Sequence, residues 1–329
     1  MKEIKFGIAG YGKMGKIREE SILNYSNAKL VSIYEISDYF CEDKNLILCN
    51  SFNELLKTNI DAVIVSTYVV VAADYVVMAL NAGKHVFCEK PPAFTAKDVL
   101  EIQAVEQKSG KLLMYGFNHR HHESIRHMKQ LFDNNEFGKI LWMRGRYGKS
   151  VDQSYYNNWR AKKELAGGGI LIDQGIHMLD LFLFFGGSFD KISASVSNLF
   201  WKLEVEDNVF ATLENTETGL TASLHSTMTQ WRHLFSLEVF LEKGYMVLNG
   251  LKTSSNSYGD EILSIAKNRS TAPAATWADE EHITYHNDSS WELEMSEYFD
   301  SIISNSKIKS GNSEDALRLM KVIDNIYTN

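Results

Sequence analysis

The chain has 329 residues, of which 44% are hydrophobic, and its formal net charge is −8 at pH 7. This length suits two domains of roughly 150 residues each, and the apolar content is sufficient for globular cores. The acidic charge argues against a nucleic-acid-binding protein, because affinity for a phosphate backbone comes from lysine and arginine.

Cysteine usage and hydropathy indicate the compartment. Cys41, Cys49 and Cys88 are odd in number and form no C-x-x-C pair, so neither a disulfide framework nor a zinc site is predicted. No run reaches the ~18 uninterrupted apolar residues of a membrane span, and the chain starts with a strand pattern rather than a signal peptide. We therefore expect a cytoplasmic protein without membrane association.

The first third of the chain alternates short apolar runs with helical segments. Five runs read as buried strands: "IKFGIAG", "AKLVSIYE", "IDAVIVST", "KHVFCEK" and "KLLMYGF". Segments such as "ADYVVMALNAG" and "AKDVLEIQAVEQKSG" between them read as helices. This alternation predicts a parallel, doubly wound sheet.

After about residue 122 the pattern changes to strands joined by short polar turns. The expected strands are "KILWMRGRYGK", "DKISASVSNLFW", "NVFATLEN", "GLTASLHSTMT", "LFSLEVFLE" and "GYMVLNG". They predict a mostly antiparallel sheet and a second domain. Near the end, a cap at Asn312 or Ser313 precedes apolar residues at helical spacing, which predicts an amphipathic helix over about 312–328.

The glycines of "GIAGYGKMG" are typical of a dinucleotide site. Gly10, Gly12 and Gly15 follow an apolar strand and open a helix, and Glu35 ends the next strand, where it could accept the ribose hydroxyls. A structural glycine turn in a flavodoxin-like sheet is the alternative. Because Glu35 would repel a 2′-phosphate, NAD is favoured over NADP.

The segment "GGGILIDQGIHMLDL" (167–181) places three polar residues in an apolar run. In a helix, Asp173, His177 and Asp180 would share one face. Two ligands are too few for a metal site, and a histidine satisfied within a core is the other alternative. We favour acid–base chemistry, with His177 as the general acid/base, and interpret Asp180 as structural.

Five motifs, in order, resemble the glucose-fructose oxidoreductase/inositol dehydrogenase (Gfo/Idh/MocA) family: "GIAGYGKMG", "EKPPAFT", "GFNHR", "NWR" and "GGGILIDQGIHMLD". The resemblance implies an N-terminal Rossmann domain over 1–120 and an α/β domain over 121–329 with a large open, mostly antiparallel sheet. The active site would lie in the crevice between them, and the C-terminal helix would pack back on the Rossmann domain. At Thr67-Tyr68-Val69 and Ala72 the chain departs from the family's Thr-Pro-Asn and histidine.

The resemblance also assigns residues. The catalytic set would be Lys90, Asp173 and His177, with Lys90 polarising the reacting oxygen and Asp173 orienting His177 or holding a substrate hydroxyl. The cofactor set is Gly10, Gly12, Lys13, Met14, Gly15, Glu35, Thr67, Glu89, Lys90, Trp159 and Arg160. The substrate set is Asn118, Arg120, Asp173 and His177. We expect no metal, and we interpret His119, His121 and His122 as surface groups.

The expected reaction is hydride transfer between NAD and a secondary alcohol or ketone of a sugar. Basic residues outnumber acidic ones between residues 119 and 163, which favours an anionic substrate. A nucleotide-linked sugar or sugar acid of bacterial surface-glycan synthesis fits best. Oxidation of myo-inositol or a free monosaccharide is the alternative, and a non-catalytic dinucleotide sensor is a second. Strands with two apolar faces predict a homodimer or homotetramer through the second sheet.

Overall fold

The computed structural model describes residues 3–37, 46–269 and 271–328, so Cys41 lies outside the described residues. The chain forms two compact units. The first contains residues 1–118 and 290–320, and the second contains 119–289 and 321–329. The expected domains, 1–120 and 121–329, are continuous, whereas each unit combines two segments of the chain.

A six-stranded parallel sheet forms the centre of the first unit, in the order β3-β2-β1-β4-β5-β6. Its strands are β1 (Ile4–Ala9), β2 (Ala28–Tyr34), β3 (Ile47–Cys49), β4 (Ala62–Val65), β5 (His85–Cys88) and β6 (Leu113–Tyr115). The five strands expected from the sequence are confirmed. The sequence did not reveal β3, because three residues at a sheet edge give no periodic pattern.

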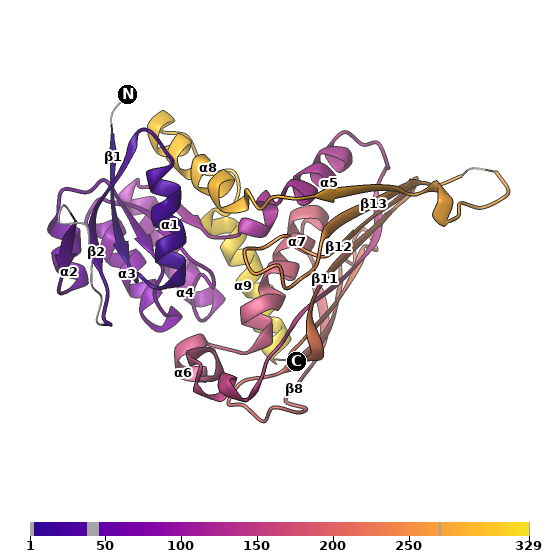
Figure 1. The fold of residues 1–329 in the computed structure, drawn as a ribbon, viewed down its shortest axis with the longest axis horizontal. Helices are drawn as coiled ribbons and strands as arrows, with labels where there is room; N and C mark the ends of the chain where they lie inside the picture. The colour runs from indigo at the N-terminus through magenta and orange to yellow at the C-terminus, as the bar shows by residue number, and fades with distance from the viewer. Residues whose placement is uncertain (1–2, 38–45, 270, 329) are drawn as a thin grey trace. The chain divides into compact units, whose positions relative to one another are not determined.

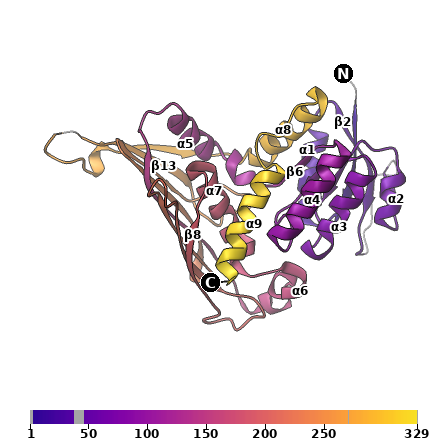
Figure 2. The same ribbon diagram turned by 180° about the vertical axis from the view of Figure 1, so that it is seen from behind.

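Helices cover both faces of this sheet. They are α1 (Lys13–Leu23), α2 (Phe52–Lys57), α3 (Val69–Asn81), α4 (Ala96–Ser109) and α8 (Ser290–Ser304). Helices α1 and α8 lie on one side, and α3 and α4 on the other (Figures 1 and 2). The rings of Tyr298 and Phe299 in α8 contact Phe6 of β1, with centroid distances of 6.4 and 5.1 Å. This aromatic packing explains why residues distant in sequence belong to the first unit.

An eight-stranded sheet forms the second unit, in the order β14-β13-β12-β11-β7-β10-β9-β8. Its strands are β7 (Ile140–Ser150), β8 (Lys191–Ser197), β9 (Asn208–Glu214), β10 (Thr221–Thr227), β11 (Thr229–Leu241), β12 (Gly244–Asn249), β13 (Glu261–Lys267) and β14 (Glu281–Tyr285). Only β7 and β10 pair in parallel, which confirms the expected mostly antiparallel sheet. Two strands were not predicted. The edge strand β14 is largely exposed and lacks an apolar face, whereas the apolar run of β13 is buried but was not interpreted as a strand.

The remaining helical elements belong mainly to the second unit. They are α5 (Glu123–Asp133), α6 (Lys163–Ala166), α7 (Ile176–Gly186), α9 (Ser313–Thr328) and the short turns η1 (Asn118–His121), η2 (Gln153–Asn157), η3 (Trp159–Ala161), η4 (Leu171–Gly175) and η5 (Trp277–Asp279). Helix α9 spans the division between the units. Its predicted cap is confirmed at Asn312, whose Oδ1 accepts hydrogen bonds from the backbone N–H groups of Glu314 and Asp315, both at 3.0 Å.

Helix α7 is the central helix of the second unit. It packs closely on β7, because a Cβ atom at Gly145 would lie 2.3 Å from Met178. By length and composition, the stretch 163–186 could cross a membrane, but 83% of its most apolar window is buried within the structure. A core helix has the same properties, and the packing of α7 on the sheet fits that interpretation.

Candidate functional site

The glycine loop between β1 and α1 shows a different role for each glycine. Gly10 has φ +84°, and a Cβ there would lie 2.5 Å from the backbone oxygen of Ser66. A Cβ at Gly15 would lie 2.4 Å from the oxygen of Gly10. A Cβ at Gly12 meets nothing within 4 Å, and Gly12 caps α1 without a side-chain hydrogen bond. Open space before an uncapped helix N-terminus fits the phosphates of a dinucleotide.

Glu35 follows β2 and contacts this loop. Its carboxylate accepts hydrogen bonds from the backbone N–H of Tyr11 at 2.5 Å and from the N–H and hydroxyl of Ser37 at 3.0 and 2.7 Å. Partial burial would raise the pKa of Glu35, but these hydrogen bonds outweigh burial and lower the pKa below its usual value. The loop therefore has an ionised carboxylate beside it at neutral pH.

The other residues predicted in the first unit lie in or near this region. Lys13 is exposed and Met14 half-buried in the first turn of α1, and the methyl group of Thr67 would lie 3.0 Å from a Cβ at Gly10. Glu89 and Lys90 are half-buried and directly follow β5. Asn118 is buried, and its Nδ2 donates to Ser290 Oγ at 3.1 Å.

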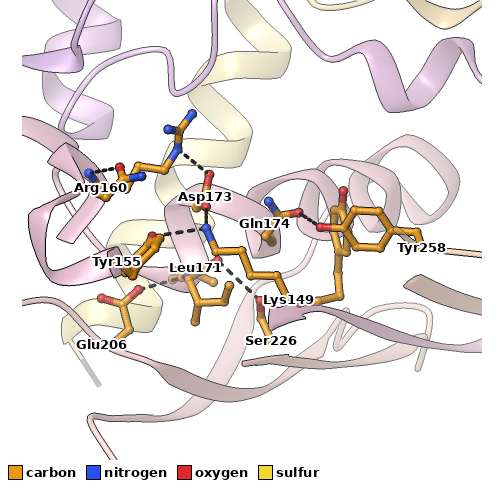
Figure 3. A network of polar contacts seen from close by, with 12 residues as sticks. Lys149, Tyr155, Arg160, Leu171, Asp173, Gln174, Glu206, Ser226 and Tyr258 are labelled. Carbon is orange, nitrogen blue, oxygen red and sulfur yellow. Dashed lines mark hydrogen bonds and ion pairs between the residues drawn. The ribbon is translucent and has the colours of Figure 1, made fainter. Parts of the chain in front are cut away.

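Asp173 in the second unit lies between two cations (Figure 3). One carboxylate oxygen contacts Lys149 Nζ, and the other accepts a hydrogen bond from Arg160 Nε at 3.2 Å. Lys149 Nζ also contacts the hydroxyl of Tyr155 at 3.2 Å. The terminal nitrogens of Arg160 point away from Asp173 in Figure 3, and the side chain is 37% exposed. This cluster combines one carboxylate with two cations.

Arg160 also lies over the ring of Trp159, 4.3 Å from its centroid. Both residues belong to η3, and the side chain of Asn158 caps this turn by accepting a hydrogen bond from Arg160 N at 3.0 Å. The ring and the ion pair with Asp173 therefore hold the guanidinium from two sides. The predicted contact of these two residues with a cofactor remains a prediction.

His177 is buried and stacks on His119, with ring centroids 3.8 Å apart. Nε2 of His119 is 3.0 Å from the hydroxyl of Tyr147, and Tyr258 packs edge-on against Tyr147. Burial raises the pKa of Tyr147 well above its usual value, so its phenol stays protonated. The expectation that His119 and His122 are surface groups is wrong: both are buried, and His122 Nδ1 contacts Glu261 Oε2 at 3.0 Å.

The expected polar stripe of 167–181 is not formed by a regular helix. In η4 the N–H of Ile176 reaches the oxygen of Leu171, five residues earlier, which is a π turn. Asp173 lies within this turn and contacts Lys149 and Arg160, whereas His177 lies in the first turn of α7 and stacks on His119.

Arg120, which the resemblance assigns to the substrate, forms a buried ion pair, and its contact with a substrate stays a prediction. Arg120 is 5% exposed, and its Nε and Nη2 donate to the two oxygens of Asp180 at 2.8 and 2.6 Å. This two-point contact makes the burial of the guanidinium tolerable. The interpretation of Asp180 as structural agrees with this pair.

Gly168 and Gly169 are required by close packing, and Gly167 has a left-handed φ of +79°. A Cβ at Gly169 would lie 2.0 Å from the backbone oxygen of Glu206, and one at Gly168 would lie 2.1 Å from the hydroxyl of Tyr327. The carboxylate of Glu206 accepts hydrogen bonds from the N–H groups of Gly169 and Leu171 at 2.8 and 3.0 Å. This carboxylate fixes the start of η4, and hence Asp173.

Several site residues carried no sequence signal. Lys149, Tyr155, Tyr147 and Tyr258 belong to no recognised motif, and only the general excess of basic residues pointed to Lys149. Among residues 3–37, 46–269 and 271–328, no group of three or more His, Cys, Asp or Glu side chains could hold a metal ion.

Two family models match the chain: "Oxidoreductase family, NAD-binding Rossmann fold" over residues 4–117, and "GFO/IDH/MocA C-terminal domain" over residues 125–247. D-glucoside 3-dehydrogenase from Escherichia coli is 34% identical over 165 residues, covering 45% of this chain and 46% of that protein. Inositol 2-dehydrogenase from Salmonella typhimurium is 32% identical over 156 residues, covering 44% and 46%. The matched regions thus span less than half the length of these two relatives.

Solved structures share the whole fold. Levoglucosan dehydrogenase in complex with NADH and levoglucosan has a TM-score of 0.84 at 19% identity, covering 99% of this chain and 97% of that one. A 3-ketoreductase from Actinomadura kijaniata with NADP and TDP-benzene has a TM-score of 0.83 at 20% identity, covering 99% and 98%. Because both sheets are present and the two models of one family match in order, the chain belongs to the Gfo/Idh/MocA family of oxidoreductases.

Proposed function

We propose that the protein is an NAD(P)-dependent oxidoreductase that transfers a hydride between nicotinamide and a secondary alcohol or ketone of a sugar. The observation that carries the proposal is the edge of the parallel sheet, where the open cradle at Gly12, the ionised Glu35 and Lys90 follow three different strands. Ligands bind at such edges in open α/β sheets.

The proposed cofactor is NAD. Gly10, Gly12, Lys13, Met14 and Gly15 would hold its phosphates at the N-terminus of α1, and Glu35 would accept the ribose hydroxyls. Thr67, Glu89, Trp159 and Arg160 are further proposed contacts. When bound, the nicotinamide would supply or accept the hydride. Of the structurally similar proteins, one holds NADH and another NADP, and the charge of Glu35 favours NAD here.

The proposed chemistry assigns one role to each of three side chains. His177 takes the proton of the reacting hydroxyl as the carbonyl forms and returns it in the reverse direction. Lys90 stabilises the negative charge that develops on that oxygen. Asp173 accepts a hydrogen bond from an adjacent substrate hydroxyl. The two cations beside Asp173 hold its carboxylate in place.

The charge balance at Asp173 supports an anionic substrate. Lys149 and Arg160 contribute two positive charges against one carboxylate, and the terminal nitrogens of Arg160 point away from Asp173 (Figure 3). A guanidinium edge suits a carboxylate or phosphate. We therefore propose a sugar acid or a nucleotide-linked sugar, in keeping with surface-glycan synthesis, as substrate.

Two alternatives to this function can be distinguished by experiment. The similarity to inositol 2-dehydrogenase favours myo-inositol or a free monosaccharide as substrate. A non-catalytic sensor would bind NADH and turn over none of these compounds. Nucleotide sugars, sugar acids and cyclitols should therefore be screened with NAD and NADP for absorbance of the reduced nicotinamide.

Two glycine substitutions separate folding from cofactor binding. Gly10→Ala should destabilise the protein by about 1–2 kcal/mol or more, because the residue is left-handed and the added Cβ meets Ser66. Gly12→Ala should change stability by less than ~0.5 kcal/mol, since its Cβ enters open space, but should weaken NADH binding. Thermal unfolding and calorimetry measure both effects. Unchanged NADH affinity in Gly12→Ala would contradict the cradle.

Glu35 should determine cofactor preference. Because its carboxylate is ionised, wild-type protein should bind NADH more tightly than NADPH. Glu35→Ser should reduce this preference, and it should also loosen the loop that Glu35 holds through Tyr11. Calorimetric titration with both cofactors tests this. Equal affinities in the wild type would exclude Glu35 from ribose recognition.

Lys90 and His177 should each be required for turnover. Lys90→Met should retain NADH binding but lower kcat by about 10²-fold or more, and His177→Asn should lose ~10² to 10⁴-fold. If both act on one proton transfer, the double variant should lose less than the product of the single losses. Steady-state kinetics on the substrate found by screening measures this. A His177→Asn rate within about twofold of wild type would remove His177 from the mechanism.

We also propose a homodimer or homotetramer. The helices α5 and α7 lie on one side of the large sheet (Figures 1 and 2). The other side presents apolar rings: Trp142 is 37% exposed and stacks on Phe240, and Phe210 is 52% exposed and stacks on His225. Apolar patches of this kind usually mark an interface.

Light scattering at micromolar concentration tests the assembly. The wild type should have the mass of a dimer or tetramer, and Phe210→Glu should shift it toward the monomer, because a charge would enter the interface. Leu100→Glu is the matched control, since Leu100 is 57% exposed on α4 of the other unit. A monomeric wild type would refute the assembly.

A further inference from the structure

A buried cation in the first unit has no part in the proposed chemistry. Arg18 lies in α1, six residues after Gly12, and is fully buried. Its guanidinium carbon is 4.3 Å from the ring centroid of Phe87 in β5 and 4.9 Å from that of Trp291 in α8. Burying an arginine is costly, so its partners must be well placed.

Two carboxylates contact this guanidinium. Nη2 of Arg18 lies 2.6 Å from Glu89 Oε1 and 2.7 Å from Glu294 Oε2, and Nε donates to Glu89 Oε1 at 2.7 Å. Glu294 is fully buried in α8, and Glu89 follows β5 directly. The cluster therefore joins α1, α8 and the residue that precedes Lys90.

The two carboxylates differ in charge. Burial raises the pKa of Glu294 to about 8 in spite of Arg18, so Glu294 is mostly protonated at neutral pH. The positive charge of Arg18 is then balanced mainly by Glu89. Glu89 has 10% of its side chain exposed, and a Cβ at Gly116 would lie 3.0 Å from its carboxylate, so the carboxylate is closely packed on that side too.

We propose that Arg18 is a positioning residue for Lys90: it holds Glu89 at the end of β5, while Glu294, Phe87 and Trp291 hold Arg18. Because Lys90 is the next residue, this contact restricts the backbone from which the lysine side chain extends. Helix α1 would then have two roles in the proposed site. Its N-terminus would bind the cofactor phosphates, and Arg18 would position Lys90 through Glu89. The inference rests on the proposed function insofar as it concerns turnover.

The variant of choice is the double substitution Arg18→Met/Glu294→Leu. Arg18→Met alone would leave buried carboxylates without their cation, and the protein could fail to fold for that reason. The double variant removes the fully buried Glu294 together with Arg18, so Glu89 is the one carboxylate of the cluster left without the cation, and 10% of its side chain is exposed. The double variant should therefore fold while Glu89 loses its anchor. Ser21→Ala, one turn further along the same helix, is the control for general disturbance of α1.

The first readout does not need turnover. An amine-reactive reagent labels lysines, and mass spectrometry gives the ratio of labelling at Lys90 to that at Lys84. Lys84 is an internal standard, because it precedes β5 and donates to the backbone oxygen of Ile60 at 2.7 Å. In the double variant, the Lys90/Lys84 labelling ratio should change relative to that of the wild type and of Ser21→Ala. An unchanged ratio in a folded double variant would overturn the proposal.

The second readout is kinetic. A displaced lysine should lower kcat by about 10-fold or more with KM near the wild-type value, because misplacement affects the reacting geometry more than substrate binding. Unchanged kcat would also overturn the proposal. Failure of the proposed function would look different: Lys90→Met would then retain turnover, while the labelling ratio would still respond to the loss of Arg18.

Discussion

The first unit depends on the parallel pairing of β1 with β2 and β4, and of β4 with β5. The hydrogen bonds continue past the strand ends: Gly10 N donates to Tyr34 O at 2.8 Å, Ser66 N to Ala9 O at 2.8 Å, and Glu89 N to Val65 O at 2.9 Å. Since parallel strands end at one edge, the loops that follow them are brought together there. The glycine loop, Glu35 and Lys90 share an edge for this reason.

The parts of the fold that could be predicted from the sequence are those that depend on residues close together in the chain. Apolar runs, glycine spacing and capping residues can be recognised within short segments of the sequence. They predicted five strands of the first sheet, six of the second and the cap at Asn312. Elements without a buried periodic face, such as β3 and β14, gave no such signal, and the buried run of β13 was missed although it is apolar. The glycine loop was predictable, because the nearest atoms to a Cβ at Gly10 and Gly15 are backbone atoms of neighbouring strands and loops.

Pairs formed by distant residues were not predictable. Arg120 reaches Asp180 60 residues away, and His122 reaches Glu261 139 residues away. A sequence shows each charge but not the partner that makes its burial tolerable. The sequence therefore did not show that Arg120 and His122 form ion pairs within the fold, and His122 was wrongly interpreted as a surface group. The same limit concealed Lys149 and Arg18.

The π turn of η4 gives the second unit an unusual sensitivity to chain length. Between Gly169, which Glu206 holds, and the start of α7, it contains one residue more than a regular helical turn. Each residue of an α-helix corresponds to a rotation of about 100°. Deleting one residue from 171–175 would thus rotate either Asp173 or His177 away from its present partners. The turn sets the rotation about the helix axis between the Asp173 carboxylate, which two cations hold, and the His177 imidazole, which stacks on His119. A single insertion or deletion would therefore change the relative orientation of these two groups without replacing either residue.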